Sequence, residues 1–295
     1  MTRRWLDFLW LGAIGLLAVM VFVSAHPNDR DSSILNRGWN GLSQAAVALD
    51  ASALQSYDEL ADIVQPATLV VMPHLQLESS ALIALDNFIS GGGTLIVLDD
   101  FSYGNDLLDA LEVGIRLNGA LLVDPLYCHR NASMPRIELV PTGEGKDPAV
   151  VVLNQATWLE VDDDAEVFAR SSYFSYGDID GDGRHGDGEL DGPLPVGAWA
   201  SRGMGTVVVV SDSSLLLNSM VEVGDNLDSL AQFVTGEVLF DQMYLPEAQV
   251  DRSKESFTEV RSALSGGAVV VALVVLVCGL AVAYAWYNRG RHDNE

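Results

Sequence analysis

Residues Asp178 to Glu189 carry the pattern of a calcium-binding loop, D-I-D-G-D-G-R-H-G-D-G-E. Such a twelve-residue loop supplies carboxylates from positions one, three and five, a backbone carbonyl from position seven and a bidentate glutamate from position twelve, with glycine at six for the sharp turn. The predicted ligands are Asp178, Asp180, Asp182, Arg184 through its carbonyl, and Glu189. We therefore predict a structural Ca²⁺ ion here.

The surroundings of the loop argue against a paired sensor of the EF-hand type. His185 occupies a position that is usually aliphatic, and Tyr173–Tyr176 before the loop and Pro193–Pro195 after it are not helical in pattern. A solitary extracellular loop is expected to bind calcium weakly, with a Kd on the order of 10⁻⁴–10⁻³ M. The alternative is an acidic, glycine-rich turn that arose by chance in a chain rich in aspartate.

A second group of polar residues follows three continuous apolar runs, Thr68–Met72, Thr94–Leu98 and Thr206–Val210. Runs of this kind are typical of strands buried on both faces of a parallel sheet, and ligands bind beyond the carboxyl ends of such strands. The candidate ligand-binding residues are His74, Asp99, Asp100, Ser211 and Asp212, with Asn218 and Asn226 nearby. They can bind a polar ligand or a metal; alternatively, the Asp and Ser side chains cap the turns that follow.

Sequence motifs for nucleophilic catalysis are missing. The chain contains no G-x-S-x-G or equivalent cysteine elbow, and Cys128-His129 has the neighbours of a loop. Asn131-Ala132-Ser133 is a glycosylation sequon. These patterns favour a non-enzymatic protein, and the alternative is a hydrolase acting at the strand-end aspartates.

The elements that must position these residues predict an α/β fold. Helical spacing over 39–49, 78–89 and 227–239 alternates with the buried strands, and shorter strands fill the turn-rich region 119–199. We expect a mostly parallel, doubly wound central sheet with a mixed-strand insertion.

Two long apolar runs flank this domain. Trp5–Val23 follows Arg3 and Arg4, and Leu264–Tyr287 precedes Arg289 and Arg291. Each approaches the roughly 20 residues that a membrane-spanning helix needs, and Arg accumulates on the cytoplasmic side. We predict an anchor at 1–25, an extracytoplasmic domain at 26–250, a linker at 251–263, a second span at 264–288 and a cytoplasmic tail at 289–295. The first run can instead be a signal peptide cleaved after Ala25.

The charge of the chain limits its partners. The formal net charge is −25, and Lys146 and Lys254 are the only lysines. This surface repels nucleic acid and anionic lipid headgroups and suits divalent cations or high salt. We therefore expect a halophilic, archaeal source; the alternative is an ordinary acidic protein. Cys128 and Cys278 fall in different regions and are not expected to pair.

Several stretches resemble the membrane-anchored family catalogued as DUF 4350. They are Val70–Pro73, Phe88–Asp100, Gly104–Leu108 and Gly203–Ser214, followed by Asn218 and by Asp225-Asn226. The family is similar in fold to class I glutamine amidotransferases and to auxiliary domains of gliding-type ABC transporters. The resemblance implies no established activity. From the apolar runs and the missing catalytic motifs, we expect a domain held on the lipid bilayer that binds a partner or ligand in a cell-envelope or transport assembly.

Overall fold

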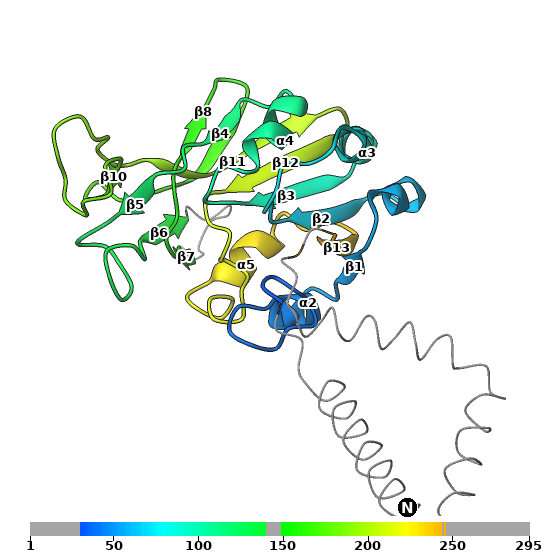
Figure 1. Cartoon of the computed structure of the whole chain (residues 1–295), viewed down its shortest axis with the longest axis horizontal. Helices are drawn as coiled ribbons and strands as arrows, with labels where there is room; N and C mark the ends of the chain where they lie inside the picture. The colour runs from blue at the N-terminus through cyan, green and yellow to red at the C-terminus, as the bar shows by residue number, and fades with distance from the viewer. Residues whose placement is uncertain (1–29, 140–148, 244, 246–295) are drawn as a thin grey trace, which may run out of the picture. The chain divides into compact units, whose positions relative to one another are not determined.

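The centre of the protein is a seven-stranded sheet, seen in a computed structural model that describes residues 30–139, 149–243 and 245 (Figure 1). Its spatial order is β1 (Ser52–Leu54), β13 (Glu237–Asp241), β2 (Ala67–Val71), β3 (Thr94–Leu98), β12 (Gly205–Val210), β11 (Pro195–Arg202) and β9 (Glu166–Arg170). Neighbours from β1 to β12 pair in parallel, whereas β11 is antiparallel to both β12 and β9. The predicted mostly parallel sheet is therefore confirmed.

Both faces of the sheet are covered, because successive side chains of each central strand enter different cores. Leu69, Leu95 and Val207 pack with 3₁₀-helix η1 (Tyr57–Asp62), α3 (Ser79–Ser90) and α4 (Asn105–Ala110). Ile96 and Val208 pack on the other face with α2 (Ser43–Ala48) and α5 (Asn226–Ala231). This arrangement explains why the strands read as unbroken apolar runs rather than alternating ones.

The region between β3 and β11 forms the predicted mixed-strand insertion. Apart from β9, which joins the central sheet, its strands pair antiparallel in three two-stranded sheets: β4 (Ile115–Leu117) with β8 (Leu159–Val161), β5 (Leu121–Val123) with β10 (Tyr176–Asp178), and β6 (Arg136–Leu139) with β7 (Ala149–Val152). The loop that follows β10 projects away from the central sheet (Figure 1).

The helix expected over 227–239 is wrong in its second half. Helix α5 ends at Ala231, Gly236 adopts a positive φ of 62°, and the chain then enters β13. Val238 and Phe240 pack in one core while Leu239 packs in the other. The apolar spacing of this segment is compatible with a helix or a strand. It forms a strand because it pairs with β1 on one side and with β2 on the other.

The two ends of the described domain are tied together. The side-chain Nε2 of Gln242, just after β13, donates to the carbonyl of Ser32, and the backbone N–H of Ile34 donates to Gln242 Oε1 at 3.0 Å. These residues belong to a compact unit that runs from Pro27 to Pro246. No helix within the described residues is both long and apolar enough to cross a membrane; the two expected spans, the linker and the tail lie outside the described residues.

Candidate functional site

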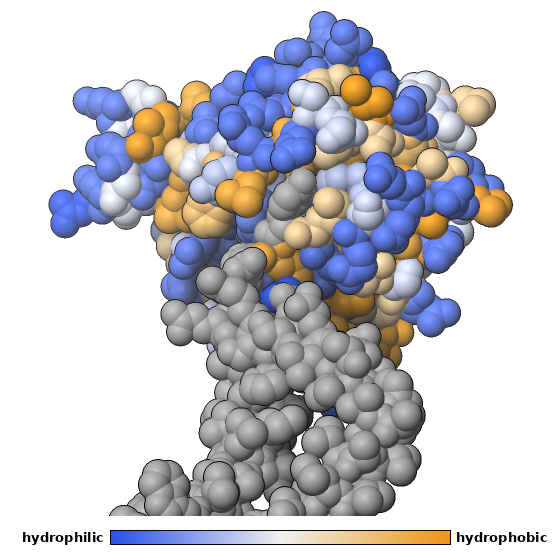
Figure 2. Space-filling view, turned by 45° about the vertical axis from the view of Figure 1, so that its right-hand side comes forward, coloured by the Kyte–Doolittle hydropathy of each residue, from blue (hydrophilic) through white to orange (hydrophobic). Residues whose placement is uncertain are grey.

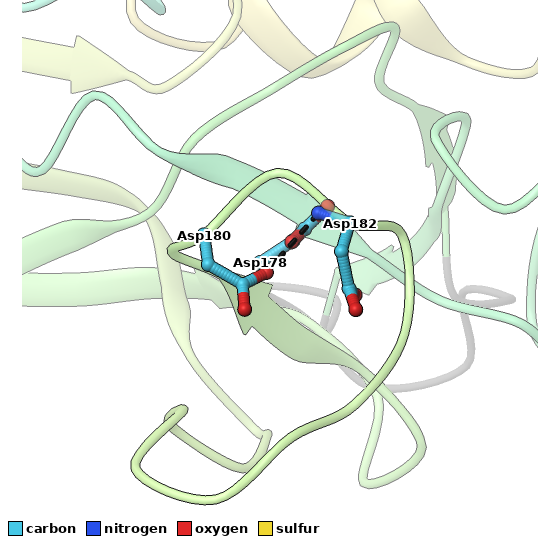
Figure 3. A group of neighbouring side chains, drawn as sticks. All are labelled: Asp178, Asp180 and Asp182. Atoms are coloured by element: carbon cyan, nitrogen blue, oxygen red, sulfur yellow. Dashed lines mark hydrogen bonds between the residues drawn. The ribbon is translucent and has the colours of Figure 1, made fainter.

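The predicted calcium loop gathers three carboxylates. Asp178 is the last residue of β10 and is buried, whereas Asp180 and Asp182 lie exposed on the loop that follows. One carboxylate oxygen from each lies within 4.8 Å of the others (Figure 3). The structure thus brings together three of the five predicted ligands.

Backbone N–H groups hold this loop in shape. The two oxygens of Asp178 accept from Gly181 at 2.9 Å and from Gly183 at 3.0 Å. Asp180 accepts from the N–H of Asp182 at 3.1 Å, and Asp182 accepts from the N–H of Arg184 at 2.7 Å. Gly183 has a φ of 71°, which favours glycine, as the motif requires at its sixth position.

Glu189, the predicted closing ligand, spans the loop instead. Its Oε1 accepts from the N–H of Ile179 at 3.0 Å and its Oε2 from the N–H of Gly186 at 2.8 Å. His185 folds back, with its ring centroid 5.2 Å from that of Tyr176 and its Nε2 3.2 Å from Asp191. Glu189 therefore already fixes the loop's closure, although it is not one of the three converging carboxylates.

The donor set of the loop fits calcium. No cation among the described residues pairs with Asp178, Asp180 or Asp182. Two unit charges about 5 Å apart repel by roughly 1 kcal/mol in water and about 3 kcal/mol at an effective dielectric constant of 20. A hard divalent cation that prefers oxygen ligands would remove this repulsion.

At the carboxyl edge of the sheet, two of the predicted ligands are occupied by the backbone. Asp99 Oδ1 accepts from the N–H of Phe101 at 2.8 Å and its Oδ2 from the N–H of Gly104 at 2.6 Å. Asp212 Oδ2 accepts from the N–H of Asn154 at 2.8 Å, while its Oδ1 accepts from both the N–H and the hydroxyl of Ser214. Both aspartates thus stabilise turns through hydrogen bonds from the backbone. This agrees with the alternative that strand-end Asp side chains cap the turns that follow.

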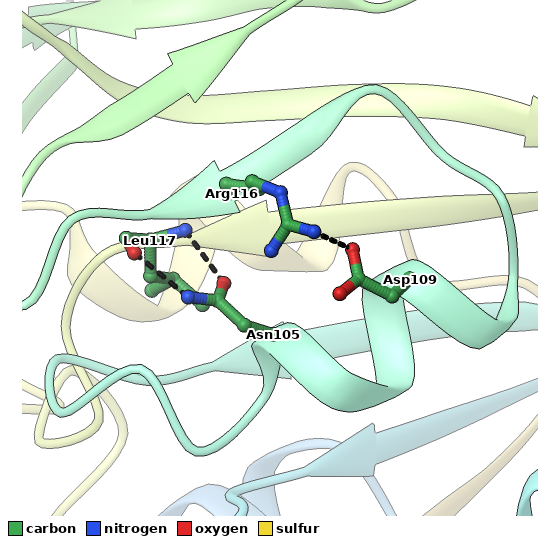
Figure 4. Close-up of polar contacts among 4 residues, drawn as sticks. All are labelled: Asn105, Asp109, Arg116 and Leu117. Carbon is green, nitrogen blue, oxygen red and sulfur yellow. Dashed lines mark hydrogen bonds and ion pairs between the residues drawn. The ribbon is translucent and has the colours of Figure 1, made fainter.

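The turn after β3 is further fixed by α4 and β4. Asn105 Nδ2 donates to the carbonyl of Leu117 and its Oδ1 accepts from the N–H of Leu117, both at 2.9 Å (Figure 4). Arg116 pairs with Asp109 on the surface beside them; an exposed pair of this kind contributes about 0–1 kcal/mol. These contacts hold Gly104 where its N–H reaches Asp99.

Asp100 differs from its neighbours because one of its oxygens is free. The side chain is buried, and its Oδ1 has no hydrogen-bond partner among the described residues. Burial raises the pKa of Asp100 to about 7, with the Asp212 charge adding to the effect and a hydrogen bond from Ser213 opposing it. Burial likewise raises the pKa of Asp212 to about 6, against the hydrogen bonds from Ser214 and Asn154.

His74 Nε2 and Ser211 Oγ are also buried and have no hydrogen-bond partner in the part of the chain that the structure describes. Burial lowers the pKa of His74, and the charges of Asp99, Asp31 and Asp241 oppose the change. A recess lined by His74 and Asp241 has a volume of about 10 Å³, about the space of one water molecule.

Asp241 is a member of this edge that the sequence reasoning missed. It ends β13, and its Oδ2 accepts from the hydroxyl of Tyr57 at 2.5 Å. Burial raises its pKa, and that Tyr57 hydrogen bond opposes the rise. The signal was present, since Leu239-Phe240-Asp241 repeats the apolar run ended by aspartate of Leu98-Asp99.

The two predicted asparagines do not join the strand-end group. Asn218 Nδ2 donates to the carbonyls of Asn36 and Gly38, and its Oδ1 accepts from the N–H of Gln44. Asn226 is fully buried; it pairs with both the N–H and the carbonyl of Val152 and donates to the carbonyl of Met220. Both residues are structural.

The surface carries further features that bear on function. Figure 2 shows a face on which hydrophilic residues predominate, with hydrophobic residues scattered among them. Asn131 of the glycosylation sequon is exposed, and Cys128 nearby is a free, half-buried thiol. A groove of about 480 Å³ runs between η1 and α3, and its lining mixes apolar residues such as Leu60 and Phe88 with polar residues such as Asp58 and Asn87.

The fold and site define an acidic α/β domain with a doubly wound, mostly parallel sheet and a carboxylate-lined loop. Residues 34–234 match the family model described as "Domain of unknown function (DUF4350)", and the chain belongs to this family.

No curated protein matches the chain in sequence. Among solved structures, the mmIFT52 N-terminal domain is 14% identical with a TM-score of 0.47, covering 60% of this chain and 78% of that one. Cytoplasmic Protein STM1381 from Salmonella typhimurium LT2 is 12% identical with a TM-score of 0.40, covering 65% and 80%. A beta-galactosidase from the Antarctic haloarchaeon Halorubrum lacusprofundi is 19% identical with a TM-score of 0.34, and the chain spans 21% of its length. None of these likenesses carries an argument about function.

Proposed function

We propose that this protein is a non-enzymatic, membrane-tethered extracytoplasmic domain that binds a partner or ligand in a cell-envelope or transport assembly. The observation that carries the proposal is the tie through Gln242. Because Gln242 bonds to both Ser32 and Ile34, the first and last parts of the described domain lie side by side, and the segments that carry the two apolar runs are joined to the domain there. Two spans joined to neighbouring points of the domain could enter one bilayer without distorting it.

The occupied strand ends support a binding rather than a catalytic role. The side-chain oxygens of Asp99 and Asp212 already accept hydrogen bonds from the backbone. The recess at His74 has a volume of about 10 Å³, far below the roughly 300–1,000 Å³ of small-molecule sites. The groove between η1 and α3, with its mixed polar and apolar lining, offers a larger surface to a partner. The sequence resemblance supports a further proposal, that the sheet is related to those of class I glutamine amidotransferases and transporter auxiliary domains.

The loop from Asp178 to Glu189 is proposed to bind Ca²⁺ as a structural clip. Asp178, Asp180 and Asp182 would supply carboxylate oxygens, and the carbonyl of Arg184 and the carboxylate of Glu189 would complete the set if the loop tightens. Once bound, the ion would cancel the repulsion among the three carboxylates. Because β10 ends at Asp178 and continues directly into this loop, the pairing of β10 would hold the first ligand in place.

Fractionation tests the tethering. The full chain, expressed with a tag after Glu295, should stay in the membrane pellet after alkaline carbonate washing, and the tag should resist protease in intact cells. Lysis should expose the tag. Recovery of full-length protein in the soluble fraction, or loss of the tag before lysis, would contradict the proposal.

One observation favours a second candidate, a hydrolase acting at the strand ends. Asp100 Oδ1, Ser211 Oγ and His74 Nε2 are buried and find no partner within residues 30–139 and 149–243. Asp100 also has a pKa of about 7, near neutrality, as a general acid or base requires. Hydrolysis of ester, amide or phosphate substrates that Asp100→Asn abolishes and Asp187→Asn preserves would establish it. Equal activity of both variants would exclude it.

A further inference from the structure

The loop from Ser32 to Leu42 is rigid although it lies at the surface. Its two ends are joined by hydrogen bonds from Ser32 N–H to the Asn40 carbonyl and from Leu42 N–H to the Ser33 carbonyl, each 2.9 Å. Asn36 is 1% exposed and points inward, where its Nδ2 donates to Asn40. These hydrogen bonds hold the backbone of the loop in place and leave its exposed side chains facing outward.

A second set of contacts holds this loop from the domain side. Asn218 donates from its side chain to the carbonyls of Asn36 and Gly38, and from its backbone to the carbonyl of Gly41. The carbonyl of Trp39 accepts from the N–H of Ser219 at 3.0 Å. Because the backbone of Trp39 is bonded to the domain, its side chain is free to point outward without loosening the loop.

The outward residues of the loop are Leu35, Arg37 and Trp39. Leu35 is 70% exposed and Trp39 is 72% exposed, and Arg37 between them is also exposed. Tryptophan is enriched at the level of lipid headgroups, where its ring is half in apolar surroundings, and arginine places its stem along apolar surface while its charge stays in water. One exposed leucine needs no explanation, but these three side chains on a pinned loop match the chemistry of a membrane interface.

The position of the loop also favours contact with a membrane interface. Leu35 directly follows Ile34, whose N–H is bonded to Gln242, so the loop begins where both ends of the domain meet. The residues between Val23 and Leu35 are few; at about 3.3–3.6 Å per extended residue they span at most on the order of 40 Å.

We propose that Leu35, Arg37 and Trp39 dock on the headgroup region of the bilayer that carries the flanking apolar runs. This inference rests on the tethering proposed above and adds an orientation to it. β13 ends at Asp241, beside Gln242, so docking through this loop turns the carboxyl edge of the sheet toward the membrane. The arginine offsets part of the repulsion between this acidic domain and anionic headgroups.

Depth-dependent quenching tests the docking. The full chain is reconstituted in phosphatidylcholine–phosphatidylglycerol vesicles as Trp39→Cys, in a Cys128→Ser, Cys278→Ser background, and labelled with an environment-sensitive fluorophore. The matched control is Met204→Cys in the same background. Met204 is 79% exposed and precedes β12, whose six residues separate it by about 20 Å from the carboxyl edge.

We expect the emission of the fluorophore at position 39 to shift to the blue and to be quenched by more than half by lipids spin-labelled near the headgroup. The emission of the fluorophore at position 204 should be neither shifted nor quenched. Equal, unquenched emission from both positions in vesicles that retain the protein would overturn the docking and leave the tethering intact. Protection of position 39 that persists in detergent, without lipid quenching, would assign the surface to another protein or a second copy and also overturn the proposal. Failure of the chain to remain with the vesicles would instead count against the tethering.

Discussion

Replacing Asp100 by asparagine should stabilise the protein at neutral and alkaline pH. Burial and the nearby Asp212 charge raise the pKa of Asp100 to about 7 from an ordinary 3.8. Between pH 3.8 and about 7, the Asp100 carboxyl keeps its proton in the folded state but has lost it in the unfolded chain. The free energy of unfolding therefore falls as pH rises from about 4 to about 7, and above that range the full loss remains.

The size of this loss follows from the same difference. About three pH units at ~1.4 kcal/mol each give roughly 4 kcal/mol as an upper bound, and the side chain is only 8% exposed, so solvent screens little of it. The substituted amide is neutral at every pH, while its oxygen can still accept the hydrogen bond from Ser213. We expect Asp100→Asn to gain a few kcal/mol over the parent near pH 8 and to gain little near pH 4.

Urea unfolding of the detergent-solubilised chain near pH 4, 6 and 8, followed by tryptophan fluorescence, measures this gain. Asp187→Asn, at an exposed position in the loop after β10, is the control and should follow the parent's stability at all three pH values. A parent and an Asp100→Asn variant whose stabilities run parallel from pH 4 to 8 would refute the reasoning.

Three further predictions test other parts of the structure. Calcium at about 10 mM is 10 to 100 times the expected Kd and should add about 1–3 kcal/mol, which raises Tm by roughly 3–10 °C; Asp178→Ala should abolish the rise, Asp187→Ala should keep it, and equal Tm values with calcium and with chelator in the parent would count against the site. Asn226→Ala breaks the buried bonds to Val152 and Met220 and should cost about 2–4 kcal/mol in thermal or urea unfolding; a change below 1 kcal/mol would show that water replaces the amide. Because the net charge is −25, molar KCl should raise Tm by screening self-repulsion, and a flat salt profile would favour an ordinary acidic protein over a halophilic one.

The parallel core was predictable from the sequence because its physics is local to each strand. Thr94–Leu98 forms β3 over the residues expected, since a run of apolar, β-branched residues has no polar face to leave in water. The same rule applies to Val238-Leu239-Phe240, but the preceding helical spacing from Leu227 outweighed it. The pairing of β13 with β1 and β2 makes that segment a strand. Pairing between segments far apart in the sequence cannot be predicted from the local residue pattern.

The candidate sites divide in the same way. The loop from Asp178 is predictable because its shape comes from contacts within a few residues, such as Gly183 N–H with Asp178. The state of the strand-end aspartates is not, because the donor to Asp212 is the N–H of Asn154, in a distant part of the chain. Sequence identifies which carboxylates end strands; the fold determines which of their oxygens remain free.

Labelling of Cys128 in intact cells tests the central proposal of an extracytoplasmic domain most directly. Cys128 is a free, half-buried thiol in the described domain, and a Cys278→Ser background makes it the only thiol of the chain. A membrane-impermeant maleimide added to intact cells should label it as fully as after lysis. Labelling only after lysis would place the domain inside the cell and contradict the account.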